Sequence, residues 1–217
     1  MDRIKERFVE TLEGSVPLHG MSVLEVGCGD GARSVRIARR CRCLTGIDPD
    51  REKIHAATRR IIPKENASFE VQRAESLPYP SQWFDTVIFT LSLHHVPVVL
   101  MRQAISVAVA TCKQEGFIVF LEPAMEGSFY EAEVDFGACD GDERAEKLAA
   151  QQAIGEHPDL ERVVELADET VFRFRSYSDF VASMAPHKGH ARIPAFLAAH
   201  GNVLRAPRII TVCKPRY

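Results

Sequence analysis

The chain has 217 residues, 46% of them hydrophobic and 26% charged, and a formal net charge of −3 at pH 7. This length supplies the core of one globular domain and leaves little room for a second full domain. No apolar run approaches the ~20 residues that cross a bilayer, and the charged N-terminus lacks the apolar core of a signal peptide. We therefore expect one cytoplasmic domain without a membrane partner, while the oligomeric state stays open.

Segments rich in β-branched and aromatic residues alternate along the chain with segments of helical periodicity. Strands are predicted near residues 21–27, 41–48, 67–73, 84–91, 116–122, 169–175 and 208–214. Helices are predicted near residues 4–13, 31–40, 51–62, 98–112, 178–185 and 193–200. This alternation is typical of an α/β fold with parallel strands and helices on both faces of the sheet. In such sheets, ligands bind at the carboxyl ends of the strands.

A predicted strand that ends in three alternate glycines is the most informative motif. The stretch 23–31 reads VLEVGCGDG and leads directly into a predicted helix. Glycine has no Cβ, so the backbone can turn sharply and approach a ligand closely. The helix behind the loop presents free N–H groups and a positive dipole end to that ligand. The motif therefore predicts a nucleotide-like cofactor.

Two acidic residues narrow the class of cofactor. Asp48 follows Gly27 by twenty-one residues, at the tip of the next predicted strand, where it can accept both hydroxyls of a ribose. Glu25 would repel a pyrophosphate and would attract an ammonium group. The third glycine position of the dinucleotide pattern falls on Ala32, a substitution that some dinucleotide binders tolerate. A dinucleotide-dependent oxidoreductase is therefore an alternative.

The motifs VLEVGCGDG, GIDPD and AESLPYPSQWFDTVIFTLSLHHV occur in this order, and together they resemble the class I S-adenosylmethionine-dependent methyltransferases. The closest resemblance is to the small-molecule branch (type 11) that includes the ubiquinone and menaquinone methyltransferases. It covers residues 20–123 and, more faintly, the end of the chain. It implies a Rossmann-like sheet of seven mostly parallel strands, with the last strand antiparallel beside the fifth. It also implies S-adenosyl-L-methionine as the cofactor.

The resemblance implies a role for each matching position around the methionine part of the cofactor. Gly27 and Gly29 would let the backbone pass it closely. Glu25 would lie near its ammonium group, and Thr90 would offer a backbone carbonyl to the same group. These roles place the methionine part at the ends of two neighbouring predicted strands.

The nucleoside part of the cofactor would meet a second set of residues. The resemblance implies that Asp48 holds the ribose hydroxyls, that Pro49 lies against the adenine, and that Ala74 offers its N–H to the adenine ring. Relatives usually have an Asp before that Ala, but this chain has Arg73, and Glu75 is the candidate substitute. Because of this departure, a second function is an alternative: a non-catalytic cofactor-binding protein that works as a regulator or subunit.

His94 and His95 come just after the predicted fourth strand, where the methyl group should project. The near-neutral pKa of histidine suits it to accept a proton from the methyl acceptor. We expect one of the two to be this base, while the other caps or packs the following helix. Catalysis by alignment of nucleophile, methyl group and sulfur alone is the alternative.

Two exclusions narrow the chemical class of the methyl acceptor. Enzymes that methylate exocyclic amines of bases carry Asn/Asp-Pro-Pro-Tyr after this strand, whereas residues 90–93 read Thr-Leu-Ser-Leu. The chain has no continuous basic stripe with interleaved aromatic residues, so we expect no nucleic-acid partner. A small organic molecule with an oxygen, nitrogen or carbon nucleophile is the expected substrate.

A strongly acidic segment follows the motifs. Residues 126–169 contain fourteen acidic and three basic residues, a local charge of −11, against +8 in the rest of the chain. This composition predicts a long solvated helix at residues 144–166. The resemblance instead implies an acidic helical lid at residues 124–169. Four of its residues would then line a substrate pocket: Phe129, Tyr130, Val134 and Phe136. The acidity disfavours anionic substrates.

Metal ligation is not expected from the spacing of cysteines and histidines. Cys41 and Cys43 are two residues apart, and His187 and His190 share one polar loop, but neither pair has a third ligand at metal-site spacing. The six cysteines are expected to be small buried hydrophobes of a reducing compartment. We therefore predict no metal.

Overall fold

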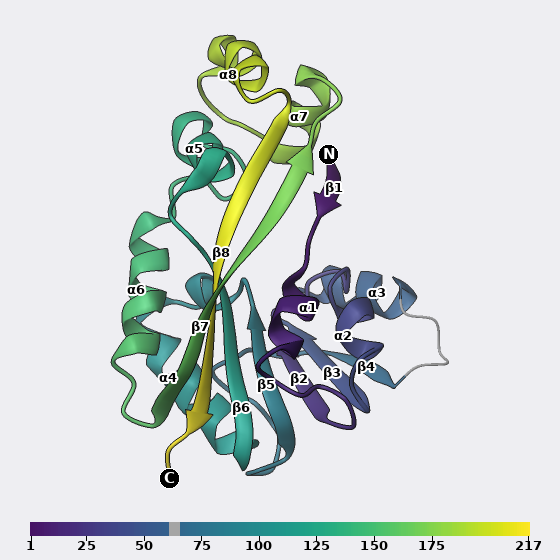
Figure 1. Cartoon of the computed structure of the whole chain (residues 1–217), viewed down its shortest axis with the longest axis vertical. Helices are drawn as coiled ribbons and strands as arrows, with labels where there is room; N and C mark the ends of the chain where they lie inside the picture. Colours follow the sequence, from purple (N-terminus) through teal and green to yellow (C-terminus); the bar gives the residue numbers. More distant parts are fainter. Residues whose placement is uncertain (61–65) are drawn as a thin grey trace.

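The computed structural model describes residues 1–60 and 66–217. Within this part of the chain, eight strands form one sheet, with helices packed against it (Figure 1). The strands are β1 (Asp2–Lys5), β2 (Ser22–Val26), β3 (Cys43–Asp48), β4 (Ala67–Val71), β5 (Phe84–Thr90), β6 (Cys112–Pro123), β7 (Leu160–Arg173) and β8 (Val203–Pro215). The α-helices are α1 (Phe8–Glu13), α2 (Ser34–Ala38), α3 (Arg51–Arg60), α4 (Val98–Thr111), α5 (Gly127–Phe136), α6 (Arg144–Gly155), α7 (Tyr177–Met184) and α8 (Ile193–Ala199). The 3-10 helices are η1 (Leu93–His95) and η2 (His190–Arg192).

The strands lie in the order β1-β7-β8-β6-β5-β2-β3-β4. The five strands from β2 to β6 are parallel, and β8 runs antiparallel between β6 and β7. The predicted α/β class is therefore confirmed, including the antiparallel last strand. The predicted helix at residues 51–62 is α3 as far as Arg60, and residues 61–62 lie outside the described residues. No helix in the described ranges has the length and apolar character needed to cross a membrane.

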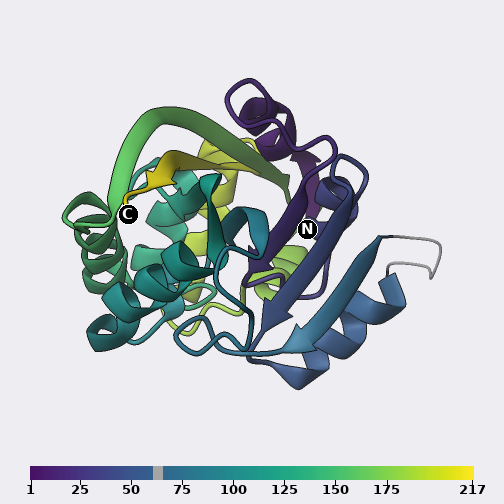
Figure 2. The same cartoon turned by 90° about the horizontal axis from the view of Figure 1, so that it is seen from below.

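Alternate residues of the central strands pack into two separate hydrophobic cores. In β5, Val87 and Phe89 pack in the core under α4 and α6, whereas Ile88 packs in the core under α1 and α2. Successive side chains of a strand point to opposite faces, so a sheet that is covered on both sides needs such a continuous apolar run. Figure 2 shows these helices on opposite sides of the sheet.

The first residues form a strand where the sequence predicted the start of a helix. β1 pairs antiparallel with β7, and α1 begins only at Phe8. All four side chains of β1 are exposed, so this segment has no apolar face for a helix to bury, and main-chain pairing orders it instead. In the described part of the chain the sheet therefore has eight strands rather than the predicted seven. α1 packs on the sheet through Phe8, Val9 and Leu12, and its residues line neither of the cavities described below.

The acidic segment at residues 126–169 folds as two helices and part of a strand, not as one helix at residues 144–166. α6 ends at Gly155, and Pro158 follows, which cannot continue a helix. β7 begins two residues later and pairs with β8 along its length. The first half of β7 exposes most of its side chains, and for this reason the sequence predicted a strand only at residues 169–175.

β7 and β8 extend beyond the rest of the sheet as a two-stranded ribbon (Figure 1). Their far ends pack with α5, α7 and α8 in a third core, which includes Phe136, Phe172 and Phe180. Because α5 follows β6 directly, this arrangement holds α5 and the connection to α6 near the carboxyl ends of the parallel strands.

Glu6, between β1 and α1, ties the N-terminal segment to the body of the domain. Its side chain is only 6% exposed. Its carboxylate accepts hydrogen bonds from Arg3 Nη1 (2.7 Å), Arg33 Nε (2.7 Å) and Arg208 Nη1 (3.2 Å). Burial by itself raises the pKa of Glu6, but the guanidinium groups of the three arginines outweigh it and hold this pKa at about 2.

Glu6→Gln is expected to lower the free energy of unfolding at pH 7 by ~3 kcal/mol, because buried Arg208 then loses its carboxylate partner. The pKa of Glu6 is about 2 in the folded chain, against an ordinary value of 4.5. Its contribution is therefore complete above pH 4.5 and is lost as the pH falls toward 2. Urea unfolding should show a smaller difference between wild type and variant at pH 3 than at pH 7.

The matched control is Glu10→Gln, which breaks a partly exposed pair with Arg36. This change should cost less than ~1 kcal/mol, because exposed ion pairs contribute little. Equal losses in the two variants would contradict a structural role for the buried carboxylate of Glu6.

Candidate functional site

A cavity of about 370 Å³ lies at the carboxyl ends of β2, β3 and β5, where open parallel sheets bind their ligands. We call it the glycine-loop cavity. Seven of the eight predicted cofactor residues lie on its wall: Gly27, Gly29, Asp48, Pro49, Ala74, Glu75 and Thr90. The same wall includes residues that the sequence motifs did not assign to the cofactor, among them Arg33, Lys53, Leu91, Ser92 and Asp140.

Glycine is required at position 27 by the close approach of the neighbouring turn. Gly27 has φ +77°, and its N–H donates to the Ile47 carbonyl (2.8 Å). A Cβ at this position would lie 2.2 Å from Ser92 Cβ, which no real contact allows. Gly29 also has a positive φ, of +55°, but a Cβ there would meet no atom within 4 Å. The loop is therefore packed on one side at Gly27 and open at Gly29.

Asp48 holds the glycine loop and is itself held in place. Its Oδ2 accepts from the N–H of Gly29 (3.0 Å), and its Oδ1 accepts from the N–H of Asp50 (3.0 Å). The side chain is buried at the cavity wall. Each carboxylate oxygen has two acceptor positions, so Asp48 retains capacity for the hydroxyl groups of a ligand.

Glu25 is the one predicted cofactor residue that the structure places off the cavity wall. It is fully buried, and its carboxylate accepts hydrogen bonds from Ser34 Oγ and Thr90 Oγ1 (3.2 Å). Burial raises its pKa to about 7, against the opposing effects of Ser34, Arg33 and Thr90. Glu25 therefore supports the glycine loop through Ser34 and Thr90, and its predicted place near an ammonium group stays a prediction.

Arg73 stands where relatives usually have an Asp, and the carboxylate of Glu75 lies close to it. Arg73 is 68% exposed, and its Nη1 lies 3.6 Å from Glu75 Oε1, whose side chain is mostly buried. Gln103 Nε2 donates to the backbone carbonyl of Glu75 (2.9 Å). Arg73 and Glu75 line the cavity on either side of Ala74 in the sequence. Glu75 therefore provides an acceptor at the end of the cavity where the sequence predicted adenine.

A second cavity of about 220 Å³ adjoins the first. We call it the aromatic cavity, because Phe129, Tyr130 and Phe172 lie on its wall. Of the four residues predicted for a substrate pocket, Phe129 and Tyr130 line it. Phe136 is instead buried in the third core, and Val134 is absent from the wall, because α5 turns these two positions away. The two cavities share four wall residues: Arg33, Leu91, His95 and Asp140.

The charged groups most deeply buried at the aromatic cavity are paired. Lys147 is 1% exposed, and its Nζ lies 2.8 Å from Glu133 Oε2 and 3.5 Å from Glu143 Oε2. Burial lowers its pKa, but the two carboxylates more than compensate and raise it overall. The Lys147 ammonium also lies 5.6 Å from the centre of the Tyr130 ring. The sequence could not reveal this cluster, because its members come from different helices and a loop.

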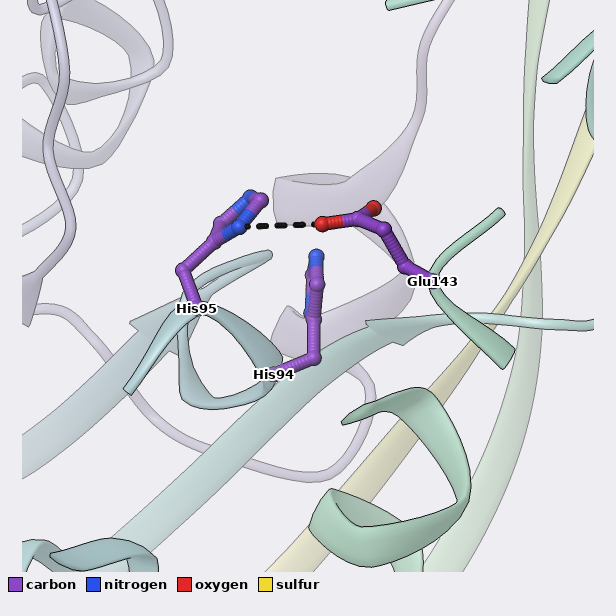
Figure 3. Close-up of side chains that lie close together, drawn as sticks. All are labelled: His94, His95 and Glu143. Atoms are coloured by element: carbon purple, nitrogen blue, oxygen red, sulfur yellow. Dashed lines mark ion pairs between the residues drawn. The ribbon is translucent and has the colours of Figure 1, made fainter. Parts of the chain in front are cut away.

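The two adjacent histidines differ in their surroundings. His94 is buried, and its Nδ1 is hydrogen-bonded to Glu122 Oε2, while Glu122 Oε1 accepts from the N–H of Leu93 (3.0 Å). The side chain of His95 is 48% exposed, and its Nδ1 lies 3.3 Å from Glu143 Oε1 (Figure 3). The hydrogen bond that the Glu143 carboxylate accepts from His95 raises the pKa of His95. His95 lines both cavities, whereas His94 lines the aromatic cavity but not the glycine-loop cavity.

Leu91 occupies the wall between the cavities in a strained backbone conformation. Its φ is +55°, in the left-handed region that a bulky side chain seldom adopts. Its N–H donates to the Leu121 carbonyl (2.8 Å), which fixes the turn after β5. Such strain costs about 1–3 kcal/mol and is concentrated at functional sites.

Comparison with known proteins finds sequence similarity to methyltransferases between residues 23 and 116. A family model described as a methyltransferase domain matches residues 23–116. An uncharacterized methyltransferase of Mycobacterium tuberculosis is 36% identical over 87 residues, which are 39% of this chain and 43% of that protein. The 27-O-demethylrifamycin SV methyltransferase of Amycolatopsis mediterranei is 32% identical over 102 residues, 45% of this chain and 38% of that protein. The matched part of the chain spans less than half the length of these curated relatives.

A solved structure from Bacillus halodurans, which carries a provisional methyltransferase assignment, resembles the whole chain. The TM-score is 0.70 at 16% sequence identity, and the likeness covers 96% of this chain and 98% of that one. At this identity the likeness shows a shared fold. The elements after residue 116, including α5 and the β7–β8 ribbon, therefore belong to the same fold as the matched domain.

Gly27→Ala is expected to lower the free energy of unfolding by roughly 3 kcal/mol, because the added methyl group must displace Ser92. Gly29→Ala is the matched control, since its methyl group meets open space and only backbone strain of about 1–2 kcal/mol remains. Urea unfolding of both variants measures the difference. Equal stability of the two variants would contradict the close approach at Gly27.

Proposed function

We propose that this chain, whose residues 23–116 match a methyltransferase-domain model, is a class I S-adenosylmethionine-dependent methyltransferase that transfers a methyl group from S-adenosyl-L-methionine to a small organic acceptor. The observation that carries the proposal is the pair of adjoining cavities at the carboxyl ends of the strands. One cavity has the residues for a ribose-containing cofactor, and the other has aromatic walls. His95 lies on the wall that they share.

The residues of the glycine-loop cavity fit the proposed cofactor. Its volume of about 370 Å³ lies within the range of ~300–1,000 Å³ that is usual for small-molecule sites. Asp48 would accept the ribose hydroxyls with its unused lone pairs, and the backbone at Gly29 leaves room for close passage of the methionine part. Pro49 and Ala74 would border the adenine, with Glu75 as the acceptor that replaces the usual acid.

When bound, S-adenosyl-L-methionine supplies a methyl carbon attached to a positively charged sulfur. The residues around it have to align this carbon with the nucleophile and exclude water. Leu91 and His95 lie on the shared wall, and in this proposal they contribute to that alignment. We assign the removal of the acceptor's proton to the His95 position, and we assign to buried His94 a positioning role through Glu122.

The walls of the aromatic cavity favour a small acceptor with a flat, apolar body. Phe129 and Phe172 lie with their ring centroids 5.0 Å apart, and Tyr130 lines the same space. The buried cations Lys147 and Arg208 already have carboxylate partners, so neither needs an anionic substrate. Its volume of about 220 Å³ is smaller than the 370 Å³ of the glycine-loop cavity, which is consistent with a small acceptor.

Asp48→Asn is expected to weaken S-adenosyl-L-methionine binding at least tenfold, because the ribose loses a charged acceptor worth ~1.5–3 kcal/mol. Isothermal titration calorimetry measures this loss. Asp50→Asn is the matched control, since the side chain of Asp50 accepts from the N–H groups of Glu52 and Lys53 at the start of α3 and Asp50 lies off the cavity wall. Binding of NAD(H) in place of S-adenosyl-L-methionine would contradict the proposed function.

His95→Ala is expected to lower turnover about 100-fold, a loss typical of a residue that assists proton removal, while cofactor affinity stays within twofold. Release of S-adenosylhomocysteine is measured over a panel of phenols and small amines. His200→Ala, a change at a surface histidine of the β7–β8 end, is the control. Cofactor binding without methylation of any acceptor in the panel would instead favour a non-catalytic regulator.

A further inference from the structure

Three potential metal ligands converge at the acceptor end of the proposed site. One ring nitrogen of His94, one of His95 and a carboxylate oxygen of Glu143 all lie within 4.8 Å of one another. Figure 3 shows the free ring nitrogen of His94 pointing at the space between His95 and Glu143. Within residues 1–60 and 66–217, this is the one group of three such ligands so close together. His187 and His190, which share one polar loop, belong to no such group within the same ranges.

We propose that His94, His95 and Glu143 bind a divalent transition-metal ion at the wall of the aromatic cavity. Two imidazoles and one carboxylate suit Zn²⁺, Mn²⁺, Fe²⁺ or Co²⁺, and three protein ligands leave coordination positions open for a substrate. All three residues line the aromatic cavity. The role of the ion in catalysis rests on the proposed function, but its binding does not.

The surroundings of His94 prepare it as a ligand. Its Nδ1 is hydrogen-bonded to the buried carboxylate of Glu122, which is itself fixed by the N–H of Leu93 (3.0 Å). This leaves Nε2 as the nitrogen directed at the other two ligands. A carboxylate behind a histidine that fixes the orientation and tautomer of the ring is the usual outer shell of a metal site.

Glu143 is held from its other side. Its Oε2 lies 3.5 Å from Lys147 Nζ, while its Oε1 faces His95 Nδ1 at 3.3 Å. The side chain is 14% exposed, and its position is fixed by its place at the N-terminus of α6 and by Lys147. The free lone pairs of Oε1 and the two imidazole nitrogens therefore form three sides of a preformed site.

An ion at this position would favour an oxygen nucleophile. Binding of the acceptor's hydroxyl oxygen to the ion lowers the pKa of that hydroxyl, and its proton leaves to water. An electron pair of the oxygen then forms the bond to the methyl carbon, and the pair of the carbon–sulfur bond goes to the sulfur. His95 acts in this case as a ligand through Nδ1, and the ion performs the step assigned above to the His95 position.

The test uses chelator-treated full-length protein without cofactor or acceptor. Titration with Co²⁺, followed by visible absorption, and with Zn²⁺, followed by calorimetry, should show one ion per chain. His95→Ala and Glu143→Gln should each weaken binding more than tenfold, and Glu122→Gln should weaken it 10–100-fold. The Glu146→Gln variant is the control and should bind the ion normally. Glu146 lies in the first turn of α6 and lines the adjoining surface hollow, but it is not one of the three ligands.

Absence of saturable Co²⁺ and Zn²⁺ binding would overturn the proposal, and so would binding that is unchanged by His95→Ala. Either result would leave the contact of His95 with Glu143 as an ion pair only. His95 is the variant of choice because its side chain is half exposed, whereas a change at buried His94 can unfold the domain. Failure of the metal titration leaves cofactor binding untouched, and failure of cofactor binding leaves the metal titration valid.

Discussion

The close approach of the glycine loop to the turn after β5 is the constraint on which both cavities depend. Gly27 has no room for a Cβ because Ser92 lies against it. Behind the glycine loop, the Glu25 carboxylate accepts hydrogen bonds from α2 and β5 and so holds the loop and the turn after β5 together. The turn fixed in this way carries Leu91 in its strained conformation and sets His95 between the two cavities. The donor and acceptor ends of the proposed site are thus built on one rigid junction.

The sequence predicted those site residues whose positions follow from the order of strands, loops and helices along the chain. A strand, a glycine loop and a helix follow one another without a break, and Asp48 ends the next strand, so the carboxyl ends of parallel strands bring Gly27, Gly29 and Asp48 together. The same reasoning brought Thr90 to the cavity wall. Sequence order alone could not show that Glu25 is hydrogen-bonded to Ser34 and Thr90, because these contacts depend on how α2 and β5 pack against β2.

Contacts between distant segments account for what the sequence could not predict. The different roles of His94 and His95 come from Glu122 at the end of β6 and Glu143 at the start of α6. Nothing near the histidines in the sequence indicates either carboxylate. The charged first half of β7 resembled a solvated helix, since its strand character comes from pairing with β8, which lies far along the chain. The substrate end of the site is therefore the part least accessible from sequence.

The central claim is that the donor sulfur and the acceptor meet at the shared wall of the two cavities. A crystal structure with S-adenosylhomocysteine bound tests it most directly. We expect the ribose hydroxyls on Asp48 and the sulfur beside Leu91 and His95, facing the aromatic cavity. A ligand bound away from the glycine loop, or one whose sulfur points away from the aromatic cavity, would contradict the proposed methyl transfer.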